Sequence, residues 1–209
     1  MIKNIIFDLG GVLIIFNMDY FLKKRGVTDE ADLKLVRDIL FYKEKLWLPI
    51  DSGEWTEEKA AEEAEKLLPE RLKEPVRDAI LNWNKPMPEI IPEMHEFIRQ
   101  AYSDGYNLYI LSNAPSSTND YIYDVPDVDL MKGIIISADI KMAKPDPEIF
   151  KFALNKFGLK ADETMFIDDN PMNIEGARSV GITGAVYRWK KGVPVTMEGL
   201  LSGEFRINA

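Results

Sequence analysis

Five short apolar runs, separated by helix-like segments, constrain the fold of this chain more than any other feature. Each run has the length of a buried strand, and the segments between them carry apolar residues at helical spacing. Strands that alternate with helices along a chain form a parallel sheet joined by right-handed crossovers. The sequence therefore predicts an α/β fold with strands at Asn4–Phe7, Leu108–Leu111, Ile134–Ser137, Met165–Ile167 and Ala185–Tyr187.

Residues 17–85 interrupt this alternation directly after the first strand. They carry almost no strand signal and predict helices at Asp29–Lys45, Glu57–Leu68 and Glu70–Trp83. An insert at this point would lie above the carboxyl ends of the strands, where it could act as a lid. We expect an α/β core made of residues 1–16 and 86–209, with residues 17–85 as an inserted, all-helical cap.

The composition excludes several classes of site and partner. A net charge of −9 disfavours binding to a nucleic-acid backbone, and no apolar run approaches the length of a membrane-spanning helix. The absence of cysteine excludes disulfides, thiolate zinc sites and cysteine nucleophiles. Residues 1–16 are largely apolar, but Asp8 interrupts them and no small-residue cleavage pattern follows. We therefore expect a cytoplasmic protein without a nucleic-acid or membrane partner.

Polar side chains stand where the predicted strands end. Asp8 follows the first strand, Ser112 and Asn113 follow the second, and Asp168 and Asp169 follow the fourth. Because the carboxyl ends of parallel strands meet at one edge of a sheet, these groups should converge there.

The three converging carboxylates, Asp8, Asp168 and Asp169, need positive charge nearby to remain ionised together. Oxygen ligands, with no cysteine and a single histidine in the chain, favour Mg²⁺ over zinc. Lys144, in the loop after the third strand, supplies a further positive charge. Mg²⁺ and one lysine formally balance three carboxylates, so the sequence predicts a magnesium site.

A phosphate group could enter a site of this kind. The metal, Lys144, Ser112 and backbone N–H groups of the Gly10-Gly11 turn would bind it. Asn113, beside Ser112, is a further candidate for contact with the substrate. An aspartate nucleophile next to a metal is the arrangement used to form an aspartyl phosphate. The expected partner is a small phosphorylated metabolite.

Four motifs in this order also carry a family resemblance. The segments FDLGGVL, ILSN, KPDPEIF and FIDDNPMNIEGA resemble the four motifs of the haloacid-dehalogenase-like hydrolase superfamily, and together they span the core nearly end to end. The resemblance implies a Rossmann-like three-layer core with a five-stranded parallel sheet in the order 5-4-1-2-3, which places Asp8 and Asp169 on adjacent strands.

The resemblance also implies a role for each residue of the motifs. Asp8 would be the nucleophile, Ser112 would hydrogen-bond the phosphoryl group, and Lys144 would steady both. Asp169 and the backbone carbonyl of Gly10 would face Mg²⁺, together with Asp8 itself. The remaining motif residues are Asp168, as a ligand or a supporting acid, and Asn173, as a supporting residue outside direct coordination.

Gly10 departs from the pattern of most phosphatases in the family, which carry a second aspartate at this position. That aspartate protonates the leaving group and later activates water, and losing such a group costs about 10²–10⁴-fold in rate. The substrate could have a good leaving group, another acid could come from the lid or the substrate, or catalysis could be weak. Glycine at this position, with the cap segment DSGEWTEE, resembles a branch that includes α-glucose-1-phosphatase-like proteins, so a sugar phosphate is favoured.

Two alternatives to a phosphatase follow from the same residues. A catalytically weak or lapsed member of the family would bind phosphorylated ligands or a protein partner without turnover. A 2-haloacid dehalogenase would use Asp8 to displace halide without magnesium, although the paired Asp168-Asp169 argues for phosphoryl chemistry.

Two further residues have roles that the motifs do not fix. Trp47, in the insert, is expected to pack in the core, with stacking on a sugar substrate as the alternative. His95, between Glu93 and Glu96, is expected to be a solvent-exposed helix residue without a catalytic role.

Overall fold

A five-stranded parallel sheet forms the core of the protein. The computed structural model describes residues 1–85 and 87–203. The strands are β1 (Asn4–Phe7), β4 (Asn107–Ser112), β5 (Gly133–Ile136), β6 (Thr164–Asp168) and β7 (Thr183–Val186). Their order across the sheet is β5-β4-β1-β6-β7. When the five strands are numbered along the chain and read from the β7 edge, this order is 5-4-1-2-3, so the predicted α/β class and strand arrangement are confirmed.

The central strand β1 is buried on both faces, and its alternate residues enter different layers. Ile5 and Phe7 join one apolar cluster, whereas Ile6 joins another that contains Phe150 and Phe166. Successive side chains of a strand point to opposite faces of the sheet, which explains this alternation. A continuous apolar run is therefore what a strand covered by helices on both faces requires.

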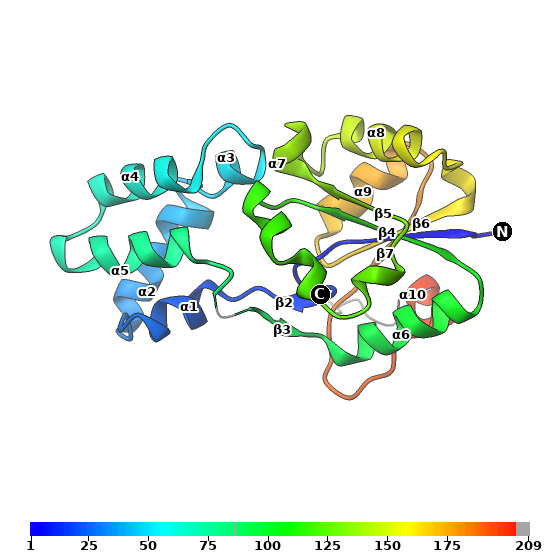
Figure 1. Cartoon of the computed structure of the whole chain (residues 1–209), viewed down its shortest axis with the longest axis horizontal. Helices are drawn as coiled ribbons and strands as arrows, with labels where there is room; N and C mark the ends of the chain where they lie inside the picture. The colour runs from blue at the N-terminus through cyan, green and yellow to red at the C-terminus, as the bar shows by residue number, and fades with distance from the viewer. Residues whose placement is uncertain (86, 204–209) are drawn as a thin grey trace.

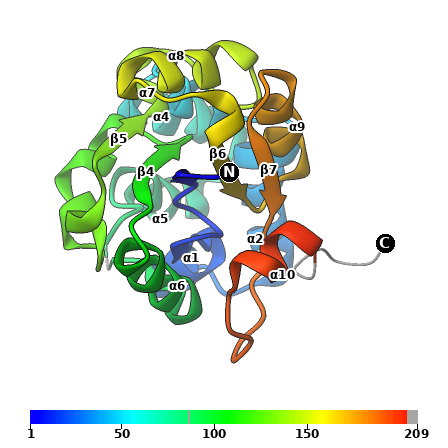
Figure 2. The ribbon, with the colours of Figure 1, turned by 90° about the vertical axis from the view of Figure 1, so that its right-hand side faces the viewer.

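Helices cover both faces of the sheet and complete the three layers (Figure 2). The helices α8 (Pro147–Phe157) and α9 (Pro171–Ser179) lie over one face, and α6 (Pro92–Ser103) and α10 (Met197–Ser202) lie over the other. The register pairs Phe7 with both Ile110 and Ile167. The carboxyl ends of these three strands therefore lie at the same edge of the sheet.

The insert after β1 forms a helical cap beside this sheet (Figure 1). Its elements are α1 (Met18–Lys24), α2 (Glu30–Arg37), a π-helix (Asp38–Tyr42), α3 (Leu48–Asp51), α4 (Glu57–Leu67) and α5 (Glu70–Leu81). Two linkers connect the cap to the core, and they pair as a short antiparallel ribbon of β2 (Ile14–Ile15) and β3 (Glu89–Ile90). The predicted cap boundary falls at Pro86, which lies outside the described residues, as do residues 204–209.

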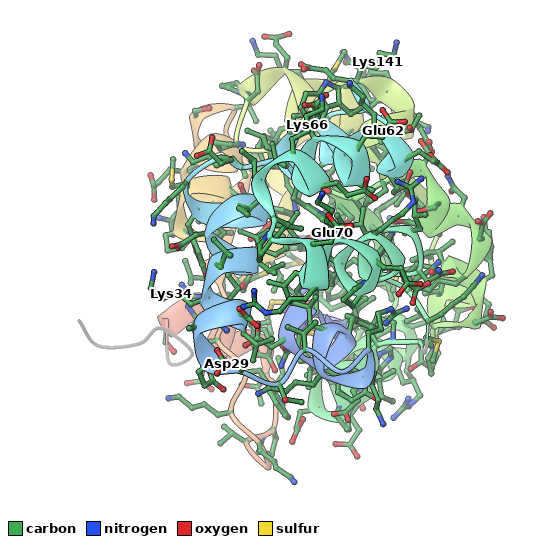
Figure 3. The ribbon with its side chains drawn as sticks, turned by 90° about the vertical axis from the view of Figure 1, so that its left-hand side faces the viewer. Asp29, Lys34, Glu62, Lys66, Glu70 and Lys141 are labelled. Carbon is green, nitrogen blue, oxygen red and sulfur yellow. The ribbon has the colours of Figure 1, made fainter. Side chains whose placement is uncertain are left out.

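The outer face of the cap is charged. Figure 3 shows Glu62 and Lys66 of α4 and Glu70 of α5 on this face, and all three side chains are exposed. Within α4, Lys59 and Lys66 both pair with Glu63. Exposed pairs of this kind contribute little to stability. The acidic run of α4 forms the solvated side of an amphipathic helix.

One predicted helix was wrong in its extent, and several short elements were not predicted. The single helix expected over Asp29–Lys45 ends at Arg37 and continues as the π-helix, where the N–H of Lys43 bonds to the carbonyl of Asp38. The segment between β4 and β5 contains short 3₁₀ turns at Ser116–Asp120, Ile122–Asp124 and Val128–Leu130. The structure also contains the short helix α7 (Ser137–Ile140), which follows β5 directly.

His95 is buried rather than exposed. Its Nδ1 lies 3.0 Å from Asp127 Oδ2 and its Nε2 lies 3.3 Å from the carbonyl oxygen of Leu13. Its position beside Met94 and near Ile98 on the buried side of α6 outweighs the polar neighbours that suggested exposure. His95 therefore links α6 to the linker that enters the cap.

No helix in the described part of the chain is both long enough and apolar enough to span a membrane.

Candidate active site

A cavity of about 810 Å³ lies between the cap and the carboxyl edge of the sheet. The core supplies strand-end residues, among them Asp8, Ser112 and Asp169, and the cap supplies residues that include Trp47 and Asp51. The predicted convergence of the strand ends is therefore what the structure shows. A site built from both parts would be completed only when the cap lies against the core.

Asp8 lines this cavity and contacts Lys144, whose side chain is fully buried behind it. The Nζ atom of Lys144 lies 2.8 Å from Asp8 Oδ1, and the backbone N–H of Leu9 donates to the same oxygen at 2.7 Å. Both contacts use Oδ1 and orient the carboxylate. They leave Oδ2 as the oxygen better placed to react.

Asp168 holds Lys144 from the other side. Its Oδ2 lies 2.8 Å from Lys144 Nζ and accepts a hydrogen bond from Asn173 Nδ2 at 3.0 Å. Its Oδ1 accepts from the backbone N–H of Asn170 at 2.7 Å. Both oxygens of Asp168 already have protein partners, so this geometry favours a supporting role over direct metal coordination. Asn173 lies beside Asp168, as its predicted supporting role requires.

The backbone of Lys144 is fixed by Asn113. The side-chain amide of Asn113 donates to the Lys144 carbonyl and accepts from the Lys144 N–H, at 2.8 Å in both cases. The ammonium group also lies 5.2 Å from the ring centre of Phe166. Asn113 also lines the cavity. Its amide holds the Lys144 backbone in place, a role that the sequence did not predict.

Asp169 packs directly against the glycine turn. A Cβ built on Gly11 would lie 2.7 Å from the Cγ atom of Asp169, and Gly11 has a φ of +77°. Only glycine fits this position without displacing the carboxylate. On its other side, Asp169 Oδ2 lies 3.6 Å from the guanidinium of Arg188.

The N–H of Gly11 donates to the carbonyl oxygen of Ile14 at 2.8 Å. The turn itself therefore uses this donor, and phosphate binding by backbone N–H groups of the turn stays a prediction. Gly10 lines the cavity, and a Cβ at this position would meet only the Cβ of Phe16, at 3.8 Å. Ser112 is buried at the end of β4 and also lines the cavity.

Burial and mutual repulsion act on the carboxylates of this site. Burial, together with the Asp168 charge, raises the pKa of Asp8 well above its usual range, against the effects of Lys144 and the Leu9 N–H. Burial and Asp168 likewise raise the pKa of Asp169. Burial opposes the charge of Lys144, but Asp168 and Asp8 outweigh it and raise the pKa of its ammonium group.

These residues fit a divalent cation. Asp8, Asp168 and Asp169 each offer a carboxylate oxygen, and the three atoms lie within 4.8 Å of one another. The donors are all hard oxygens, the type that Mg²⁺ prefers. Asp8 and Asp169 would hold the ion, because the oxygens of Asp168 are already bonded within the protein.

A cluster of aromatic side chains also lines the cavity. The ring of Phe16 lies 5.8 Å from Trp47 and 5.9 Å from Trp83, and these two indoles lie 6.0 Å apart. Trp47 is buried, as core packing predicts, and it also lines the cavity. The cavity therefore has a charged floor and an apolar aromatic wall.

Arg188 and Asp51 are among the lining residues that the sequence did not predict. Arg188 follows β7 by two residues, so the strand-end rule that selected Asp8 and Ser112 could have found it. Asp51 lies at the end of α3 in the cap, where no strand-end signal exists.

Comparisons with known proteins agree with this architecture. A D-ribitol-5-phosphate phosphatase from Bacteroides thetaiotaomicron is 26% identical over 196 residues, which cover 87% of this chain and 89% of that protein. A HAD family enzyme from the same organism, solved as a magnesium complex, has a TM-score of 0.66 and 26% identity, and the match covers 92% of this chain and 95% of that one.

Other curated relatives match only in part. A phosphoserine phosphatase from Thermus thermophilus is 30% identical over 116 residues, which cover 54% of this chain and 46% of that protein. The chain thus spans less than half the length of this relative. The family model described as haloacid dehalogenase-like hydrolase matches residues 2–181. Because this match covers most of the chain, the protein belongs to the haloacid dehalogenase-like hydrolase family.

Proposed function

We propose that this protein is a magnesium-dependent phosphatase that hydrolyses a small phosphomonoester through an aspartyl phosphate on Asp8. The observation that carries the proposal is the position of Asp8 at the cavity floor, with Oδ1 bonded to Lys144 and Leu9. A buried carboxylate fixed through one oxygen and open to a cavity at the other is suited to nucleophilic attack.

Each residue of the floor has a defined task in this proposal. Asp8 Oδ2 attacks phosphorus, and the bond from phosphorus to the leaving oxygen breaks. Lys144 stabilises negative charge on the phosphoryl oxygens while it fixes the nucleophile. Ser112 donates a hydrogen bond to the phosphoryl group. Asp168 and Asn113 hold Lys144 so that its ammonium group is in place before the substrate arrives.

The proposed metal site consists of Asp8, Asp169 and the carbonyl of Gly10. When bound there, Mg²⁺ would neutralise carboxylate and phosphate charge that Lys144 alone cannot balance. Gly11 leaves the space that Asp169 occupies, so its contribution to the site is steric.

The substrate proposed for this cavity is a sugar or sugar-alcohol phosphate in the cytoplasm. The aromatic wall suits the carbon skeleton of such a molecule, and the polar lining suits its hydroxyl groups. The D-ribitol-5-phosphate phosphatase that matches 87% of this chain supports this substrate class. The net charge of −9 is also more consistent with a small metabolite than with a nucleic acid.

Removal of divalent metal is expected to abolish hydrolysis of 4-nitrophenyl phosphate, and Mg²⁺ is expected to restore it. The reason is that the carboxylates of buried Asp8 and partly exposed Asp169 repel an incoming phosphate unless a cation is present. The measurement is steady-state release of 4-nitrophenol from chelator-treated protein titrated with Mg²⁺. A screen of sugar and sugar-alcohol phosphates under the same conditions then identifies the preferred substrate.

Two outcomes would favour the alternatives. Halide release from a 2-haloacid in the presence of chelator would indicate dehalogenation; a curated (S)-2-haloacid dehalogenase of Burkholderia cepacia is 31% identical over 91 residues. Tight binding of beryllofluoride with magnesium, without turnover of any phosphate ester, would indicate a lapsed enzyme, the alternative that Gly10 motivates.

Gly11→Ala is expected to weaken Mg²⁺ activation by about 10-fold or more, because the new methyl group would displace Asp169. Gly26→Ala is the matched control. Gly26 also has a positive φ, of +84°, but a Cβ there meets nothing within 4 Å. Both variants should lose about 1 kcal/mol or somewhat more of stability from the left-handed backbone. Only Gly11→Ala should raise the Mg²⁺ concentration for half-maximal activity, and equal values for the two variants would contradict this role of Gly11.

A further inference from the structure

The proposed reaction lacks a proton donor for the leaving group, and the following inference rests on that proposed function. Gly10 supplies no side chain where many relatives in the family would carry an acid. A sugar-alcohol leaving group is a poor one, so its departure needs a proton from another group. That group must lie in the cavity that contains Asp8.

Four carboxylates line the described part of this cavity: Asp8, Asp19, Asp51 and Asp169. Asp19 is paired with the guanidinium of Arg37. Asp8 and Asp169 belong to the proposed nucleophile and metal site. Asp51 is the remaining carboxyl group, and its Oδ1 is buried without a hydrogen-bond partner among the described residues.

The backbone of Asp51 is fixed on the core by two contacts. Ser137 donates a hydrogen bond from its Oγ to the backbone carbonyl of Asp51. Two residues later, Gly53 packs so tightly that an added Cβ would lie 2.3 Å from the carbonyl oxygen of Ala138. Figure 1 shows α3 lying against α7 at this point. These contacts fix the position of the acid relative to the end of the sheet.

We propose that Asp51 is the general acid and base that replaces the side chain missing at Gly10. In the first step the protonated Asp51 gives its proton to the leaving oxygen as that oxygen separates from phosphorus and Asp8 bonds to phosphorus. In the second step the Asp51 carboxylate takes a proton from the water that attacks phosphorus. This step releases inorganic phosphate, frees Asp8 and returns Asp51 to its protonated form.

The environment of Asp51 suits both steps. Burial raises its pKa to about 7, against the opposing effects of a hydrogen bond from the Trp47 side chain and the charge of Lys144. A carboxyl group with this pKa is present in both protonation states near neutral pH, as an acid that later becomes a base requires. Its unpartnered oxygen also has no competing hydrogen bond to break.

The test is the dependence of rate on the leaving group in Asp51→Asn. Three probes of similar size are used with Mg²⁺: 4-nitrophenyl, phenyl and benzyl phosphate, whose leaving groups become progressively poorer. We expect kcat/KM for 4-nitrophenyl phosphate to change little, because kcat/KM reports the first step and nitrophenolate leaves without a proton. We expect kcat/KM for benzyl phosphate to fall by about 10²-fold or more. The readout is kcat/KM rather than kcat, because kcat also contains the second step, which needs Asp51 as a base for every probe. Glu54→Gln, an exposed acid in the same turn, is the matched control and should leave all three rates unchanged.

The outcomes separate this role from the proposed function. Equal losses of kcat/KM for all three probes would indicate that Asp51 binds substrate or supports the fold, and no loss of kcat/KM for any of them would also overturn the role. A melting temperature close to that of the wild type checks that the variant folds. If the wild-type protein hydrolyses none of the probes with Mg²⁺, the proposed function fails, and the role of Asp51 fails with it.

Discussion

Replacement of Asp8 by Asn is expected to lower kcat/KM for 4-nitrophenyl phosphate by at least about 10⁴-fold. Asn has the shape of Asp, but its amide oxygen is a poor nucleophile and cannot form the phosphoryl intermediate. The loss should appear in kcat rather than in KM, because the phosphate-binding groups Lys144 and Ser112 remain. The measurement is steady-state kinetics with saturating Mg²⁺.

The same variant makes a second prediction about stability. Burial and the Asp168 charge disfavour the ionised form of Asp8, so its raised pKa means that the carboxylate destabilises the fold at neutral pH. Asp8→Asn should therefore melt at the same temperature as the wild type or higher when metal is removed. Asp8→Ala, which leaves no amide to deamidate, should be equally inactive. Full activity in either variant would exclude Asp8 as the nucleophile.

The sequence predicted the sheet well because each strand is specified locally. Asn4–Phe7 is a continuous apolar run, and the structure pairs it on both sides, as burial on two faces requires. The β2–β3 ribbon was missed because each strand contains two residues, too few to show a period. The exposure of His95 was mispredicted because its partner Asp127 lies in a distant irregular segment.

The floor of the site followed from the sequence for the same reason. Asp8, Ser112 and Asp169 stand at strand ends, and parallel strands bring their ends together. The contact between Asn113 and Lys144 could not be read, because it joins two loops whose conformations depend on each other. Asp51 was also out of reach, since its place in the cavity depends on docking of the cap against Ser137, 86 residues away in the chain.

Replacement of Lys144 by Met is expected to reduce both stability and activity. The Lys144 side chain is fully buried, and its Nζ lies 2.8 Å from both Asp8 Oδ1 and Asp168 Oδ2. Removing the ammonium group leaves two buried carboxylates without their charge partner, which typically costs about 3–5 kcal/mol. Activity should fall by about 10²–10³-fold, because a donor to the phosphoryl oxygens is lost. Urea denaturation in the presence of chelator measures the free energy of unfolding.

A double-variant comparison decides whether the cost comes from the unpaired carboxylates. Lys144→Met/Asp168→Asn should recover part of the stability lost in Lys144→Met, because one buried charge is removed with its partner. Lys151→Met is the matched control: Lys151 is half-exposed and pairs with the exposed Glu148, so its loss should not measurably change stability. If the double variant is as unstable as the sum of the two single variants, the carboxylates act independently of Lys144. Recovery would instead show that Lys144 and Asp168 are energetically coupled. The same ammonium group also contacts Asp8, so the contact that stabilises the site would be the one that orients Asp8 for attack.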